Sequence, residues 1–145
     1  MSTVLNQTFA DVTLCGETVF AESQVVTTDV INLTVEKEAS CQYVLVGGRL
    51  CYTVTITNDS DVDFTTGELG GVIFRDPLAE NLTYIPGTFE YTIDCGQPDP
   101  VPPVQVEPTI NSDNVMTYDS LQIPAGCKAI VTFCVTVGAQ NGDDN

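Results

Sequence analysis

Histidine and tryptophan are both absent from the sequence, and only four of its 145 residues are basic. Histidine is the most common general base and a frequent zinc ligand, so its absence removes the usual acid–base and zinc chemistry. No two cysteines have the short spacing of a zinc site, and neither a paired nucleophile and base nor a glycine-rich phosphate loop is present. The sequence therefore predicts a protein that is not an enzyme and that needs no cofactor.

The shortage of basic residues excludes a second class of function. Lys37, Arg49, Arg75 and Lys128 do not cluster, and 20 acidic residues give a net charge of −16. A nucleic-acid-binding protein needs a basic surface, and an anionic membrane would repel this chain. The same charge keeps separate copies apart, so salt should favour any self-association.

Long apolar segments are missing as well. No stretch approaches the ~20 apolar residues that a membrane-spanning helix needs. The first 20 residues lack the basic start and the continuous apolar segment of a secretory signal. We therefore expect neither membrane insertion nor a classical signal peptide.

What the sequence does contain is the alternation of β-strands. Leu50, Tyr52, Val54 and Ile56 alternate with cysteine and threonine, which is typical of a strand with one buried face. Similar segments are expected to form strands over 29–38, 71–76, 82–85, 88–93, 115–123 and 128–137. The turn signals between them predict an all-β fold, a Greek-key immunoglobulin-like or jellyroll-like sandwich of seven or eight strands.

The chain divides into three parts on composition. Residues 1–28 form an N-terminal extension, residues 29–138 form the sandwich, and residues 139–145 form a polar tail expected to be disordered. The extension has strand-like alternation. It is either an extra edge strand or loose tail of the same domain, or an arm that adds a strand to a neighbouring copy.

Six cysteines are many for a cytosolic protein, and their even number suggests disulfides. They are Cys15, Cys41, Cys51, Cys95, Cys127 and Cys134. Cys51 and Cys134 fall on the outward, threonine-bearing faces of their strands, where they can pair across adjacent strands or with another molecule. Cys15, on the arm, is the first choice for a bond between copies. Ordinary internal pairing is the alternative, with Cys95–Cys127 as a clamp on the proline-rich connection.

Two further sets of residues suggest binding or cross-linking chemistry. Asp59, Asp61 and Asp63 have the spacing that begins a calcium loop, although the rest of that pattern is missing and a solvated acidic loop is the default interpretation. A lysine in a sandwich can also form an amide bond with an asparagine beside a carboxylate. The candidates for that bond are Lys37, with Asn58 or Asn81, and Asp76, and a plain lysine–carboxylate ion pair is the alternative.

Several motifs in order give the chain a family resemblance. They are Val35-x-Lys37, VGGRLCYTVTITNDS from Val46, GVIFRDP from Gly71, NLTYIPGT from Asn81 and LQIPAG from Leu121. This order resembles the bacterial and archaeal conserved repeat domain, domain of unknown function eleven, over about residues 29–137. The resemblance implies an immunoglobulin-like sandwich of cell-surface and extracellular proteins. In overall plan, the chain is also similar to endospore-appendage (Ena-type) fibre subunits, which implies jellyroll-like subunits joined by arms and disulfides.

These observations predict a structural protein. We expect it to assemble with copies of itself into an extracellular or spore-surface fibre, through exchange of the N-terminal arm and through intermolecular disulfides. The alternative is a monomeric cell-surface adhesion or binding module, with loops at one end of the sandwich contacting a ligand.

Overall fold

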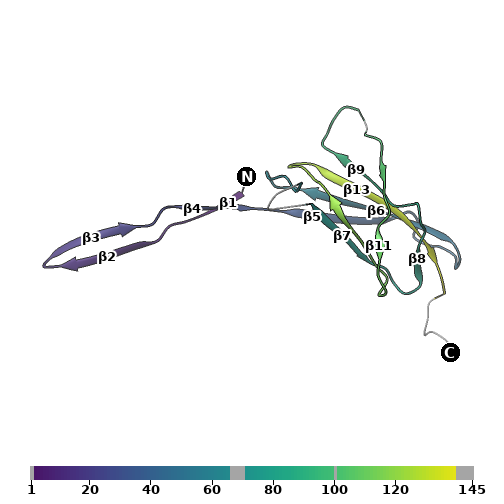
Figure 1. The fold of residues 1–145 in the computed structure, drawn as a ribbon, viewed down its shortest axis with the longest axis horizontal. Helices are drawn as coiled ribbons and strands as arrows, with labels where there is room; N and C mark the ends of the chain where they lie inside the picture. The colour runs from purple at the N-terminus through teal and green to yellow at the C-terminus, as the bar shows by residue number, and fades with distance from the viewer. Residues whose placement is uncertain (1, 66–70, 100, 140–145) are drawn as a thin grey trace.

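The protein is an all-β molecule in which a long two-stranded arm projects from a β-sandwich (Figure 1). The computed structural model describes residues 2–65, 71–99 and 101–139, and these residues contain no helix. The all-β prediction is therefore confirmed. The predicted disordered tail lies, apart from Ala139, outside the described residues.

The larger sheet of the sandwich has six strands. In spatial order they are β10 (Val104–Gln105), β9 (Glu90–Asp94), β13 (Lys128–Val137), β6 (Arg49–Asn58) and β5 (Leu33–Ala39), with β8 (Leu82–Tyr84) also paired to β13. All the pairs are antiparallel. Because β13 is flanked by β6 on one side and by β8 and β9 on the other, it is the central strand of this sheet.

The smaller sheet has only three strands, in the order β11 (Thr109–Ile110), β12 (Val115–Leu121) and β7 (Val72–Pro77). The short β10 lies in the proline-rich connection that follows Cys95, and β11 comes directly after it. The other sandwich strands from β6 onward begin and end within a few residues of the predicted positions, because turn residues bound each alternating segment.

The core lies between these two sheets. Leu50, Val54 and Ile56 of β6 are buried, as their alternation predicts. They meet Phe133, whose ring centroid is 5.5 Å from that of Tyr52 and 6.1 Å from that of Phe74 on the opposite sheet. Such tilted and edge-to-face aromatic contacts stabilise a core beyond the area that they bury.

Residues 2–30 form the arm. Strands β1 (Ser2–Asn6) and β4 (Val26–Val30) pair at its base, and β2 (Phe9–Leu14) and β3 (Glu17–Glu22) pair in its outer half. The turn at the tip contains Cys15 and Gly16 with φ of 51° and 83°, and glycine suits this left-handed backbone. Within the described ranges, the four arm strands pair only with each other.

The predicted strand over 29–38 is wrong in its bounds and in its burial. The strand is interrupted at Asn32. The backbone amide of Asn32 donates to Ser60 Oγ, and its backbone carbonyl accepts from the backbone amide of Asp59. Asp29 and Val30 consequently belong to the arm. The sandwich strand β5 begins at Leu33, and every one of its residues is exposed.

Candidate assembly surfaces

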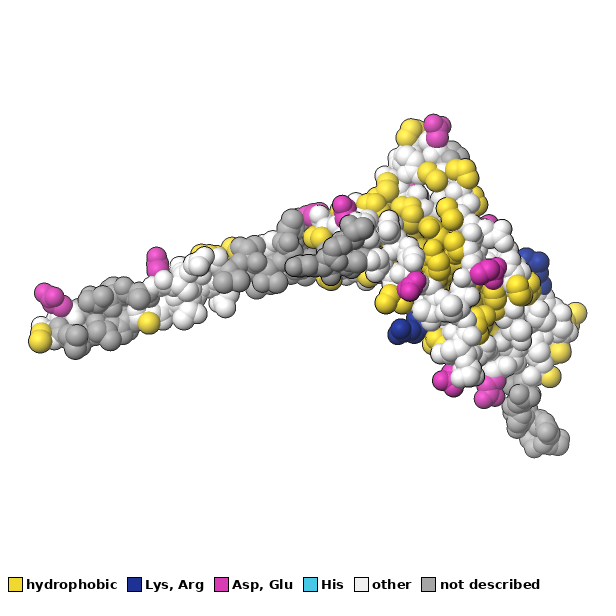
Figure 2. Space-filling model, in the orientation of Figure 1, with side chains coloured by type: hydrophobic (Ala, Val, Ile, Leu, Met, Phe, Trp, Pro, Cys, Tyr) yellow, Lys and Arg dark blue, Asp and Glu magenta, His cyan; other side chains and the backbone are white. Residues whose placement is uncertain are grey.

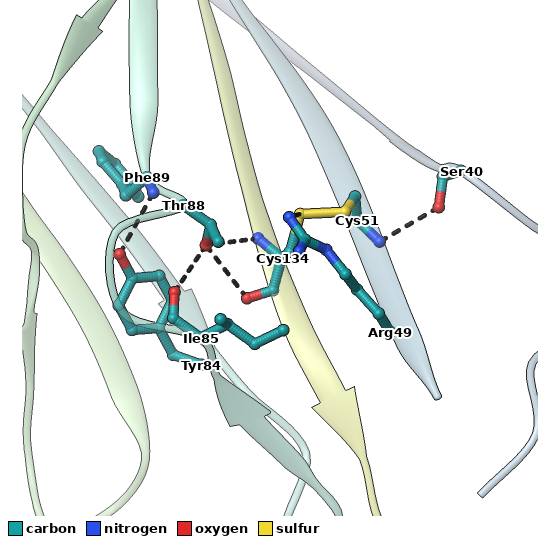
Figure 3. Close-up of a disulfide and its surroundings, with 8 residues drawn as sticks. All are labelled: Ser40, Arg49, Cys51, Tyr84, Ile85, Thr88, Phe89 and Cys134. Atoms are coloured by element: carbon teal, nitrogen blue, oxygen red, sulfur yellow. Dashed lines mark hydrogen bonds between the residues drawn. A yellow bond between two sulfur atoms is a disulfide. The ribbon is translucent and has the colours of Figure 1, made fainter. Parts of the chain in front are cut away.

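The disulfide between Cys51 and Cys134 joins the two central strands of the larger sheet (Figure 3). The two residues are directly opposite in the antiparallel register of β6 and β13, with Cα atoms 4.0 Å apart. Thr88 Oγ1 accepts from the Cys134 amide and donates to the Ile85 carbonyl, so the turn before β9 covers this bond. Of the two alternatives left open for Cys51 and Cys134, the structure has the pairing across adjacent strands, so neither is available for a bond to another molecule.

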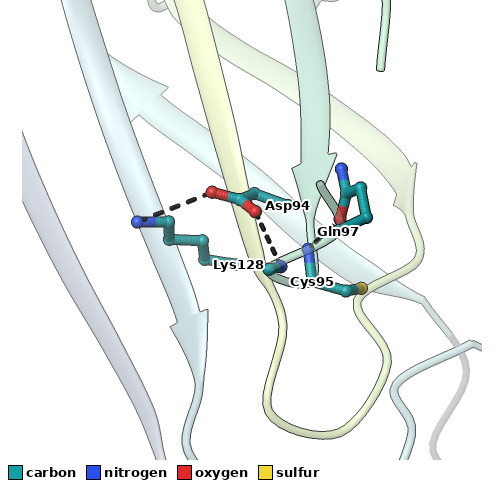
Figure 4. Close-up of polar contacts among 5 residues, drawn as sticks. Asp94, Cys95, Gln97 and Lys128 are labelled. Atoms are coloured by element: carbon teal, nitrogen blue, oxygen red, sulfur yellow. Dashed lines mark hydrogen bonds and ion pairs between the residues drawn. The ribbon is translucent and has the colours of Figure 1, made fainter. Parts of the chain in front are cut away.

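A second internal disulfide joins Cys95, after β9, to Cys127, before β13. Each cysteine is next in sequence to a residue of the pair Asp94 and Lys128, which face each other in the register and form an ion pair of 3.8 Å (Figure 4). This is the internal pairing weighed from the sequence. Two bonds within one chain are typical of a protein from an oxidising environment.

Cys15 and Cys41 are the two cysteines that remain free, and both are exposed. Cys15 lies at the tip of the arm. Cys41 follows β5, in a loop that continues with Tyr43, Leu45 and Val46, of which Tyr43 is 84% exposed. The structure therefore separates the six cysteines into four that close the sandwich and two that lie outside its core.

In the described part of the acidic loop, the three aspartates are not grouped around a common point. Asp63 Oδ1 accepts from the Ala125 amide at 2.8 Å, and Asp59 Oδ2 accepts from Thr34 Oγ1 at 3.3 Å. Asp61 also has an interaction partner. In the part of the chain that the structure describes, no group of three acidic residues or cysteines is placed to hold a metal ion. The calcium candidates are therefore residues that shape a loop.

Lys37 forms an ion pair with Asp76 and does not contact Asn58. Its Nζ lies 2.7 Å from Asp76 Oδ2 on β7 and 4.4 Å from the centre of the Tyr52 ring. The side chain of Asn58 is buried, and its amide Nδ2 donates to the backbone carbonyls of Val62 and Ile123. Asn58 faces Leu33 in the register, four residues from Lys37, or roughly 13 Å along a strand. The geometry is that of an ion pair, and Asn58 is not placed to bond to Lys37.

Apolar exposure is concentrated in the first third of the chain. Most of the exposed large apolar residues precede residue 47, and they lie on the arm, on β5 and in the loop after β5. Figure 2 shows apolar side chains along the arm as well as on the sandwich. The exposed large apolar residues that precede residue 47 are Leu5, Phe9, Val25, Ile31, Leu33, Val35, Tyr43, Val44, Leu45 and Val46.

Sequence reasoning missed that this surface is exposed. The alternation of Leu33 and Val35 indicates one apolar face, and the pattern alone does not show whether another strand covers that face. The covering strand must come from elsewhere in the chain or from another chain. Only the topology, with six strands facing three, shows that the face is open.

Comparison with known protein families, curated proteins and solved structures finds no match. Over residues 2–65, 71–99 and 101–139, no helix is long and apolar enough to span a membrane.

Proposed function

We propose that the protein is a structural subunit that assembles with copies of itself into a fibre through its N-terminal arm. One observation carries the proposal. All the buried apolar side chains found in the described residues belong to Leu50 or to later residues, although apolar residues recur through the first 48. A region of this length whose described apolar side chains are all exposed is suited to burial against another molecule.

The physical state of the arm supports this proposal. A lone two-stranded hairpin is at best marginally stable in water, because it buries little and orders many residues. The arm points away from its own sandwich (Figure 1), so the surface that it would bind belongs to another copy. Such a contact joins two different surfaces, and repetition of a contact of this kind gives an open filament unless the rotation closes a ring.

The free thiols of Cys15 and Cys41 suit covalent bonds between assembled copies. Each new disulfide takes one hydrogen from each of two thiols, and an oxidant such as dioxygen or a small disulfide accepts the two electrons and two protons. The internal disulfides and the resemblance to extracellular repeat domains and endospore-appendage subunits support a place for the fibre outside the cell, on a cell or spore surface.

Removal of residues 1–30 tests the proposal. The full-length protein should form filaments that are visible by negative-stain electron microscopy, and more of them in 0.5 M salt because salt screens the charge of −16. The shortened protein should remain monomeric with an unchanged unfolding midpoint. A full-length protein that stays monomeric at every salt concentration, on non-reducing gels and by microscopy, would contradict the proposal.

The same variant separates the fibre from the alternative of a monomeric adhesion module. If the loops of the sandwich bind a surface ligand, the shortened protein should keep that binding. If assembly is the function, removal of the arm should abolish assembly and leave only a stable sandwich.

A further inference from the structure

We infer that the arm of one copy docks on the next copy along the flank formed by β5 and β7. It would lie beside the free edge of β7 and cover the inward-facing side of β5. This inference rests on the proposed fibre and names the surface that accepts the arm.

The inward-facing side of β5 is a part of the core that lacks a cover. Leu33 and Val35 face Asn58 and Ile56 across the β5–β6 pair, and Asn58 and Ile56 are both buried. Opposite residues of an antiparallel pair point to the same side of the sheet. Leu33 is nevertheless 41% exposed and Val35 64% exposed, because the smaller sheet ends at β7 and does not extend over β5.

The opposite flank of the sandwich is closed by the chain itself. The connection from β10 to β11 crosses between the two sheets, and Val106 packs against the core there. Glu107 accepts hydrogen bonds from the Tyr84 hydroxyl and the Gly87 amide. Burial raises the pKa of Tyr84, and the nearby Glu107 carboxylate adds to the rise.

Across the β5–β7 flank, by contrast, the described contact is between two side chains, Lys37 and Asp76. The edge of β7 away from β12 and the edge of β5 away from β6 pair with no other described strand. A free strand edge presents unpaired backbone groups, which an incoming strand can satisfy.

The arm matches this flank in form. It is already a paired hairpin, and its register places Ala10 opposite Ala21 and Val12 opposite Val19. Strand β2 has six residues and β5 has seven, so the outer half of the arm can span the open face. A strand added beside β7 would lie over Leu33 and Val35.

Charge adds one contact to this match. The arm carries Asp11, Glu17, Glu22 and Asp29 and has no basic residue. The flank is mixed in charge, because Glu36 and Glu38 of β5 and Asp76 of β7 accompany Lys37 and the exposed Arg75. Lys37 lies on the same side of β5 as Leu33 and Val35, opposite the buried Val54, so an arm carboxylate that covers this side meets a basic group there.

A matched pair of substitutions tests the acceptor surface in the full-length protein. Leu33→Asp puts a charge on the open flank, and Ile110→Asp puts the same charge on β11 at the opposite edge of the smaller sheet. The two side chains are equally accessible, at 41% and 40%. We expect Leu33→Asp, and likewise Val35→Asp, to reduce the filament mass at least tenfold. Ile110→Asp should assemble as the wild type does, and all three variants should keep the wild-type unfolding midpoint.

Carbodiimide cross-linking gives an independent test, because it joins a lysine amine directly to a nearby carboxylate. The chain has only two lysines, Lys37 and Lys128, whose side chains are 41% and 45% exposed. Filaments from a mixture of unlabelled and ¹⁵N-labelled protein should give mixed-label peptides that join Lys37 to arm carboxylates. Lys128 should give no such peptides.

The outcomes separate this inference from the proposed fibre. If filaments depend on residues 1–30, but Leu33→Asp and Val35→Asp assemble normally or the mixed-label links form at Lys128, the fibre stands and the β5–β7 acceptor is wrong. If filaments form without residues 1–30, the proposed role of the arm fails first. Loss of assembly in Leu33→Asp and Val35→Asp, with Lys37 links to the arm, supports both.

Discussion

Residues 2–48 and residues 49–137 are built from the same kind of strand, yet they differ in what they bury. The later region contains all the apolar side chains that the described structure buries, both disulfides and the aromatic cluster around Phe133. The earlier region contains β1–β5, most of the exposed apolar residues and both free thiols. Strand formation and burial are therefore separate properties, since a strand can form in one molecule while the surface that covers it is missing from that molecule.

The sharpest contrast is expected between two apolar substitutions. Phe133→Ala should reduce the free energy of unfolding by about 3–5 kcal/mol, because Phe133 is fully buried and contacts several other rings. Val35→Ala should change it by less than about 0.5 kcal/mol, because Val35 is exposed. Urea unfolding of freshly purified monomer measures both, and a large cost for Val35→Ala would show that β5 is covered within one chain.

The cysteines give the next largest contrast. Replacing Cys51 and Cys134 together by alanine should cost about 2–4 kcal/mol, since their bond closes a loop with a sequence separation of 83. Replacing the free Cys15 and Cys41 by serine should leave unfolding within about 0.5 kcal/mol of the wild type, while high-mass bands on non-reducing gels should disappear. Equal losses of stability in the two double variants would remove the distinction between the regions.

The smallest effect is expected where the two regions meet. Lys37→Gln should cost about 1–2 kcal/mol, because it leaves the mostly buried Asp76 carboxylate without its partner at 2.7 Å. Lys128→Gln should cost less than about 0.5 kcal/mol, because its ion pair with Asp94 is longer and open to water. Thermal unfolding at low salt and in 1 M salt checks this, and the cost of Lys37→Gln should shrink in 1 M salt.

Much of the sandwich can be predicted from sequence, because its signals are local. Alternation placed Leu50, Val54 and Ile56 inward, and the turn residues placed the ends of most strands. The pairing of Cys51 with Cys134 was left open, because it depends on β6 and β13 being neighbours although 83 positions separate the two cysteines. The extension could be identified as strand-like, but a hairpin requires a register between β2 and β3 that alternation does not determine.

The order of strands also decides how the molecule would carry tension. A pull on the arm reaches the sandwich first at β5, which pairs with β6 and with no other described strand. Peeling away β5, the loop after it and the first two residues of β6 would release residues 31–50, or roughly 70 Å of extended chain. Beyond that length, the pull meets the Cys51–Cys134 bond, and the enclosed residues cannot extend without cleavage of a covalent bond. A fibre of such subunits would lengthen in short, reversible steps with a fixed upper bound per subunit, and its core would stay folded under load.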